Sequence, residues 1–124
     1  MLMEITSKKI GQTIESLVCN YLINQGLKLI IKNFQSKCGE IDLIMQDSKI
    51  LVFVEVRHRR LNDYGGGVAT VDKHKQQKII KTASFYLQKH NLYDKVLCRF
   101  DIVATSGKNG DQLTWIKDAF WAKW

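Results

Sequence analysis

The sequence lacks proline altogether, and its three cysteines, Cys19, Cys38 and Cys98, lie far apart with no C-x-x-C pair. An odd number of scattered cysteines excludes a disulfide framework or a zinc site as the basis of the fold. The 45% hydrophobic and 25% charged residues exclude a collagen-like or intrinsically disordered chain. A length of 124 residues therefore predicts a single domain over residues 1–124.

Long apolar runs and common ligand motifs are also absent. The longest aliphatic run, residues 50–54, is too short to span a bilayer, and the N-terminus has no apolar signal-peptide core. The glycines at 65–67 lack the context of a P-loop, and the three histidines lack the spacing of paired metal ligands. We therefore expect a cytoplasmic protein with no membrane partner and no histidine metal site.

The positive charge is concentrated in one segment. Residues 57–81 hold seven Lys and Arg against two Asp and Glu, so they carry +5 of the formal net charge of +7, whereas residues 1–56 are neutral overall. Phosphate backbones attract such a patch through counterion release. A polyanion is therefore the default expectation for the partner, and the basic surface of a merely soluble domain is the alternative.

Hydrophobic periodicity predicts the order α-β-β-β-α-β-β, an α/β sandwich with a central mixed sheet. Helices are expected at residues 7–25 and 71–90, and strands at 27–34, 40–45, 50–57, 97–105 and 113–117. The expected apolar faces of the helices are Ile10, Ile14, Leu17, Val18, Tyr21 and Leu22 in the first, and Ile79, Ile80, Ala83, Tyr86 and Leu87 in the second. The third strand is expected at the centre of the sheet, and the lysine-bearing first strand at its outside.

Two carboxylates are expected to converge in the hairpin of the second and third strands. A two-residue loop at 47–48 pairs Glu40 with Glu55, whereas a loop at 48–49 pairs Asp42 with Glu55. Either register brings Asp42 close to Glu55, and a three-residue loop would send them to opposite faces. Paired carboxylates suit Mg²⁺ or Mn²⁺, and such an ion can polarise a phosphodiester.

Two further charged residues are placed to join that pair. Arg57 shares a strand face with Glu55 and could hold a phosphate, but a guanidinium keeps its proton and is a poor general base. Glu15 lies at the edge of the apolar arc of the first helix, from which it can reach the sheet. The alternatives are a plain cross-strand ion pair at Arg57 and a solvated carboxylate at Glu15.

Five motifs in order resemble the YraN family of small bacterial proteins over nearly the whole chain. They are GEIDLI at 39–44, VFVEVR at 52–57, KQQK at 75–78, RFDIV at 99–103 and WIKDAF at 115–120. That family is similar to Holliday-junction resolvases and restriction endonucleases. The resemblance therefore implies a restriction-endonuclease-like three-layer sandwich with the PD-(D/E)XK nuclease fold.

The resemblance also implies roles for individual residues. Asp42 and Glu55 would be the catalytic carboxylates that bind Mg²⁺ or Mn²⁺, and Glu15 would match the first-helix glutamate of resolvase-like members. Arg57 takes the position that the nuclease lysine usually holds, which places the hydrolytic step in question.

Other residues would bind nucleic acid or support the site. The expected contacts to nucleic acid are Arg57, Arg59, Arg60, Lys73, Lys75, Gln76 and Lys78, with exposed helix charge as the alternative for the lysines and the glutamine. Glu40 is expected either beside the metal ligands or as a plain polar strand residue. Asp101 could support the site, but a structural ion pair with Arg99 is favoured.

The expected function is metal-dependent phosphodiester cleavage in structured or branched DNA. A homodimer is compatible with the resemblance, because resolvase-like proteins pair two sites across a junction. The alternative is a catalytically inactive nuclease-fold module that binds nucleic acid in DNA repair or processing. A third hypothesis is a protein-interaction surface at the aromatic C-terminus, Phe120, Trp121 and Trp124.

Overall fold

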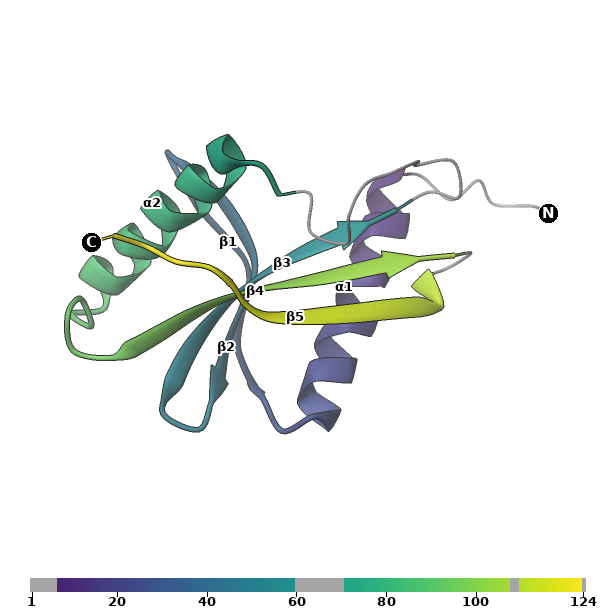
Figure 1. The fold of residues 1–124 in the computed structure, drawn as a ribbon, viewed down its shortest axis with the longest axis horizontal. Coiled ribbons are helices and arrows are strands. Elements are labelled where there is room, and N and C mark those ends of the chain that lie inside the picture. The colour runs from purple at the N-terminus through teal and green to yellow at the C-terminus, as the bar shows by residue number, and fades with distance from the viewer. Residues whose placement is uncertain (1–6, 60–70, 108–109, 124) are drawn as a thin grey trace.

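The computed structural model describes residues 7–59, 71–107 and 110–123 (Figure 1). The elements are α1 (Ser7–Asn24), β1 (Lys28–Ser36), β2 (Gly39–Asp47), β3 (Ile50–His58), α2 (Lys73–Lys89), β4 (Leu97–Ser106) and β5 (Gln112–Phe120). The predicted order α-β-β-β-α-β-β is confirmed, and the ends of each element lie within three residues of the expected positions. No helix in the described ranges is long and apolar enough to cross a membrane.

The five strands form one mixed sheet in the order β1-β2-β3-β4-β5. Neighbouring strands are antiparallel except β3 and β4, which are parallel and are joined through α2. The apolar strand β3 is central and the lysine-bearing β1 is an edge strand, as predicted. Figure 1 shows α1 and α2 on opposite faces of the sheet, which confirms the three-layer α/β sandwich.

Each helix covers its own apolar cluster. On the α2 face, Phe53 stacks on Phe100 with ring centroids 5.3 Å apart, and Phe100 stacks on Phe120 at 5.0 Å. The α2 residues buried in this cluster include Ile79, Ala83, Tyr86 and Leu87, and the partly buried Ile80 packs against it. On the α1 face, the buried helix residues are Ile14, Val18, Cys19 and Leu22. Both helices are therefore held by burial of an apolar stripe.

The apolar face predicted for α1 was too wide. Ile10 and Leu17 are 42% and 45% exposed, and Tyr21 is half-buried with its ring edge-on to Trp115. In the described residues, α1 is the helix that covers this face of the sheet, and only its narrow i, i+4, i+8 stripe of Ile14, Val18 and Leu22 is buried. Leu17 lies beside that stripe, and Ile10 continues its spacing one turn toward the N-terminus but is exposed.

The start of α2 is set by a cap. Asp72 has the extended backbone of an N-cap residue, and its Oδ1 accepts a hydrogen bond from the Lys75 backbone N–H at 2.8 Å. The helix therefore begins at Lys73, two residues later than predicted. At the C-terminus, Phe120 completes the core while Trp121 is 74% exposed, and Trp124 lies outside the described residues.

A buried ion-pair network joins β4 to β5. The fully buried Asp101 accepts hydrogen bonds from Arg99 Nε (2.9 Å) and Nη2 (3.0 Å), from Trp115 Nε1 (3.0 Å) and from the Asp118 backbone N–H (2.9 Å). Arg99 also donates to Asp47 Oδ2 at 3.0 Å. Every oxygen of Asp101 is engaged, so this carboxylate stabilises the fold.

We expect Asp101→Ala to lower the free energy of unfolding by about 3 kcal/mol or more, because it leaves the largely buried Arg99 charge without its main partner. Urea unfolding followed by circular dichroism measures this change. The exposed Asp111→Ala variant is the matched control and should change stability by less than about 0.5 kcal/mol. Equal stability of the two variants would contradict the structural role of Asp101.

Candidate functional site

The hairpin register decides where the acidic residues of β2 and β3 lie. Asp47 pairs with Ile50 and Leu43 pairs with Val54, so the loop is the two-residue turn at 48–49. This is the second of the two predicted registers. The paired residues end at Leu43 and Val54, and just beyond them the Asp42 carboxyl group lies within hydrogen-bonding reach of Glu55. The backbone N–H of Val56 donates to Asp42 Oδ2 at 2.8 Å and fixes that carboxylate against β3.

Four acidic side chains gather at this point, and we call Glu15, Glu40, Asp42 and Glu55 the carboxyl cluster. Glu15 of α1 and Glu55 of β3 are each within hydrogen-bonding reach of the Asp42 carboxyl group. Glu40 interacts electrostatically with both Asp42 and Glu15. The structure therefore brings together the three predicted catalytic carboxylates, and the predicted supporting residue Glu40 lies beside them.

Asn33 is a member of the site that sequence reasoning missed. It lies on β1 between the pairs Lys32↔Leu43 and Phe34↔Ile41, which places it across the strand pair from Asp42, and it adopts a φ of 55°. With its amide nitrogen facing the carboxylates, it donates to Glu40 Oε1 at 2.8 Å and to Glu15 Oε2 at 3.1 Å. No motif marked this residue; only the β1–β2 register could have indicated it.

Burial raises the pKa values of both members of the central pair, and repulsion from Asp42 adds to the rise at Glu55. Burial, followed by repulsion from Asp42, raises the pKa of Glu55 to about 8, against the opposing effects of Lys75 and Arg57. Burial also raises the pKa of Asp42, although the Val56 N–H and Lys75 favour its ionised form. Two carboxyl groups in this position share a proton near neutral pH unless a cation neutralises them.

The pKa values of the two outer acids, Glu15 and Glu40, are also raised. Burial, with repulsion from Asp42 and Glu40, raises the pKa of Glu15 to about 7, and the hydrogen bond from Asn33 partly offsets this rise. Burial and repulsion from Asp42 raise the pKa of the exposed Glu40. The carboxyl cluster is thus a region of unbalanced negative charge, and it attracts protons or cations.

Lys75 and Arg57 provide the positive charge at the cluster. Lys75 Nζ lies 3.9 Å from Glu55 Oε1, and it also favours the ionised forms of Asp42 and Glu40. Arg57 lies two residues after Glu55 on the face of β3 that α2 covers, and it favours the ionised form of Glu55. The structure therefore places Lys75, one of the predicted contacts to nucleic acid, at the cluster.

The other predicted contacts to nucleic acid are spread around the start of α2 and the end of β3. Lys73 and Lys78 are exposed on α2, whereas the Gln76 amide nitrogen donates to the Val71 carbonyl at 2.9 Å. The Gln76 amide therefore helps to cap its own helix.

Of the two arginines that follow β3, the structure describes Arg59. The Arg59 backbone N–H donates to the Thr105 carbonyl at 2.7 Å, and its Nη2 is buried without a hydrogen-bond partner in the described part of the chain. Arg60 lies outside the described residues.

Asp101 lies apart from the carboxyl cluster. It pairs with Val54 on the neighbouring strand, and its side chain points to the α1 face, whereas Glu55 points to the α2 face. Its hydrogen bonds to Arg99, Trp115 and Asp118 agree with the favoured structural role.

The donor chemistry of the cluster matches a hard divalent cation. Asp42 and Glu55 offer carboxylate oxygens, and Mg²⁺ commonly takes one or two protein carboxylates and fills its other positions with water and phosphate oxygens. Among the described residues, no group of three or more His, Cys, Asp or Glu side chains is arranged as a ready-made metal site. Any metal held here would therefore rely on ligands from water or substrate as well as from Asp42 and Glu55.

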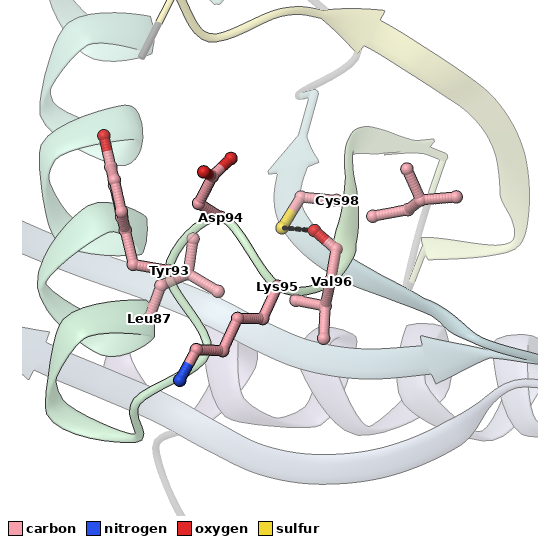
Figure 2. A pocket seen from close by; sticks show the side chains of 7 residues that line it. Leu87, Tyr93, Asp94, Lys95, Val96 and Cys98 are labelled. Carbon is pink, nitrogen blue, oxygen red and sulfur yellow. Dashed lines mark hydrogen bonds between the residues drawn. The ribbon is translucent and has the colours of Figure 1, made fainter.

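A second cavity lies away from the carboxyl cluster. Figure 2 shows this cavity of about 520 Å³, which is bordered by Leu87 at the far end of α2 and by Tyr93, Asp94 and Cys98. Leu87 lies twelve residues beyond Lys75, or about 18 Å along the helix. A smaller cavity of about 390 Å³ adjoins the carboxyl cluster through Glu15 and Glu40. The larger of these two cavities is therefore separate from the carboxyl cluster.

The carboxyl cluster predicts an unusual dependence of stability on pH in metal-free protein. The folded-state pKa of Glu55, about 8, lies above the ordinary value of 4.5, so the folded protein retains a proton that the unfolded chain loses. Stability from this group is fully present below pH 4.5 and is lost as the pH rises through 8. We expect Glu55→Gln to become more stable relative to the wild type between pH 5 and pH 8.5, by a difference on the order of a few kcal/mol.

Chemical denaturation in EDTA at several pH values measures this difference. The exposed Asp111→Asn variant is the control, and its stability relative to the wild type should stay nearly constant over the same range. A Glu55→Gln variant whose advantage does not grow with pH would show that Glu55 is ionised without penalty in the folded protein.

Comparison with known proteins identifies the family. Residues 14–105 match the family described as "Uncharacterised protein family UPF0102". A UPF0102 protein of Coxiella burnetii is 55% identical over 113 residues, which cover 91% of this chain and 92% of the relative. A UPF0102 protein of Legionella pneumophila is 46% identical over 110 residues (89% and 92%), and the Escherichia coli protein YraN is 44% identical over 118 residues (94% and 88%). The match runs from the helix that carries Glu15 through strand β4, and the chain belongs to the UPF0102 (YraN) family.

Proposed function

We propose that this protein binds nucleic acid and hydrolyses phosphodiester bonds with a divalent metal ion, acting on structured or branched DNA in the cytoplasm. The observation that carries the proposal is the meeting of Asp42 and Glu55 across β2 and β3 with Lys75 Nζ 3.9 Å from Glu55 Oε1. Carboxylates that would hold a cation thus adjoin a group that would hold an anion. A metal-bound phosphodiester needs both.

Asp42 and Glu55 are the residues that would hold Mg²⁺ or Mn²⁺. The bound ion would polarise the phosphodiester and lower the pKa of a water ligand. The Val56 N–H keeps the Asp42 carboxylate oriented through its 2.8 Å hydrogen bond. Glu15 reaches Asp42 from α1, so it acts through that carboxylate as a positioning residue.

Lys75 and Arg57 would bind the phosphate oxygens on the α2 side of the cluster. Lys75 is held at the first turn of α2 by the Asp72 cap, so its ammonium group starts from a fixed backbone position. Arg57 stands in place of the usual nuclease lysine and retains its charge throughout. The lysine at the cluster is supplied by the helix instead of by the strand.

The surroundings of the cluster favour a polyanionic substrate. Lys73 and Lys78 are exposed on the same helix as Lys75, within the segment that carries most of the net charge. Such charges attract a phosphate backbone and make binding depend on salt. The preference for branched DNA rests on the resemblance to resolvases, and a homodimer stays a prediction on the same ground.

We expect Asp42→Asn and Glu55→Gln each to reduce cleavage of a labelled four-way junction in Mg²⁺ or Mn²⁺ by more than about 100-fold, since changes even outside the metal ligands cost about 10- to 100-fold at such sites. Both substitutions keep the side-chain shape and remove one charge. Gel analysis of product formed per unit time, with a linear duplex in parallel, measures the effect.

Asp111→Asn is the matched control and should cleave like the wild type. Cleavage that persists in both cluster variants would identify a contaminating nuclease and reject the site. Wild-type protein that binds the junction but never cleaves it, in either metal, would reject the hydrolytic step.

We expect Lys75→Met to weaken DNA binding and to reduce the slope of log K against log salt by about one unit, because one phosphate contact is lost. Methionine keeps the apolar stem of the side chain and removes its charge. Fluorescence anisotropy over a range of KCl concentrations measures the slope. The exposed Lys81→Met variant is the control, and an equal loss of slope there would mean that α2 binds by its overall charge alone.

The second candidate function is a nucleic-acid-binding module without catalysis. Arg57 favours it, because no lysine lies at that position of the strand. This candidate predicts salt-dependent binding that Lys75→Met weakens, with no metal-dependent turnover. Metal-stimulated cleavage that depends on Asp42 would exclude it.

A further inference from the structure

The cavity of about 390 Å³ beside the carboxyl cluster has a polar lining. It lies between the first half of α1 and the edge formed by β1 and β2, and its lining residues are Gly11, Gln12, Glu15, Asn33, Gln35 and Glu40. We propose that this cavity binds one unpaired nucleobase next to the phosphodiester held at Asp42 and Glu55. The inference rests on the proposed function and names the substrate class of that site.

The charge of the lining excludes a phosphate as the occupant. Two carboxylates, Glu15 and Glu40, face the cavity, and its lining contains neither lysine nor arginine. The basic side chains Lys75 and Arg57 belong instead to α2 and to the face of β3 that α2 covers. A nucleotide whose phosphate lies at those cations would therefore direct its uncharged base toward the α1 side.

The hydrogen-bonding groups match the edge of a base. Carboxylates accept from exocyclic amines, and side-chain amides donate and accept together, as in known contacts to cytosine and adenine. Gln12 and Gln35 are exposed amides at the cavity, and the Asn33 amide nitrogen donates to the carboxylates of both Glu15 and Glu40. The donors and acceptors are thus arranged around a space larger than a single base.

Gly11 leaves one wall of the cavity bare. A Cβ atom built at this residue meets nothing within 4 Å, so the wall there is helix backbone against which a flat ring can lie. A side chain added at residue 11 would therefore start in open space at its Cβ atom. Leucine is also a better helix former than glycine, so the substitution should leave α1 intact.

The position of the cavity selects the substrate. Glu15 belongs both to the cavity lining and to the group of carboxyls around Asp42, so a base held here belongs to a nucleotide close to the bound phosphate. A base within a continuous duplex would first have to leave its stack, whereas a base at a branch, flap or bulge is already unpaired. The cavity therefore favours nucleic acid that has an unpaired base beside the cleavage position.

The test compares two labelled DNAs. One is a continuous duplex, and the other is the same duplex with one additional, unpaired 2-aminopurine that forms a bulge. Binding is measured by anisotropy of a distant fluorophore, in EDTA and in parallel in Ca²⁺. We expect the wild type to bind the bulged DNA about 10-fold more tightly, the order that one or two net hydrogen bonds supply. The 2-aminopurine fluorescence should change on binding.

Gly11→Leu should bind the duplex like the wild type but lose both the preference for the bulge and the fluorescence change. Gly11→Ala should keep most of the preference, and Asn20→Leu, which adds the same side chain at an exposed position of α1, should keep all of it. Thermal unfolding checks that each variant is folded. If Gly11→Leu unfolds, the same binding measurements are made with Gln12→Ala and Gln35→Ala. Each of these variants should reduce the preference for the bulged DNA.

Two results would overturn the proposal: a wild type without preference under both conditions, and a preference that these variants leave unchanged. An arginine-containing peptide that competes for the cavity better than single-stranded DNA would also reject a base as its ligand. Cleavage is not part of this measurement. A preference for the bulge without turnover in Mg²⁺ would reject the proposed phosphodiesterase activity and support base binding in the cavity. Cleavage without any preference for the bulge would support the phosphodiesterase activity and reject base binding in the cavity.

Discussion

The pairing of β2 with β3 is the constraint on which the candidate site depends. Side chains alternate between the two faces of a sheet, so a shift of one residue in this hairpin would move one acid away from the other. The two-residue turn at 48–49 sets the register, and the Val56 N–H then fixes Asp42 in place. The apolar neighbours Leu43 and Val54, both fully buried, oppose any slip, because it would expose them to water. Core packing and site geometry are thus secured by the same strand pair.

The two helices complete the site from opposite faces. Glu15 reaches Asp42 from α1, and Lys75 reaches Glu55 from α2. Neither contact is local in sequence, and each depends on the apolar stripe that holds its helix against the sheet. The site therefore exists only when all three layers are assembled.

Two groups of acids in this protein illustrate the difference between stability and function. Asp101 is buried with hydrogen bonds to Arg99, Trp115 and a backbone amide, so its charge is fully compensated. The carboxyl cluster instead gathers acids that burial and mutual repulsion push toward protonation, with Lys75 and Arg57 as partial compensation. A charge imbalance of this kind costs folding free energy, and perturbed pKa values of this kind cluster at functional sites in proteins. The same sheet thus carries a balanced network on its α1 face and an unbalanced acidic cluster elsewhere.

The sequence by itself determined the order of the elements, the central position of β3, the segment of concentrated positive charge and the convergence of Asp42 with Glu55. These features depend on periodicities of about two and 3.6 residues and on hairpin geometry, which are local properties of the chain. Only the tertiary structure decided which of two registers the hairpin adopts, that α1 buries a narrower stripe than its pattern predicts, and that Asp101 lies on the other face from Glu55. It also decided that Asn33 joins the acids and that Lys75 lies at Glu55, because both contacts join elements that are distant in sequence and are set by packing.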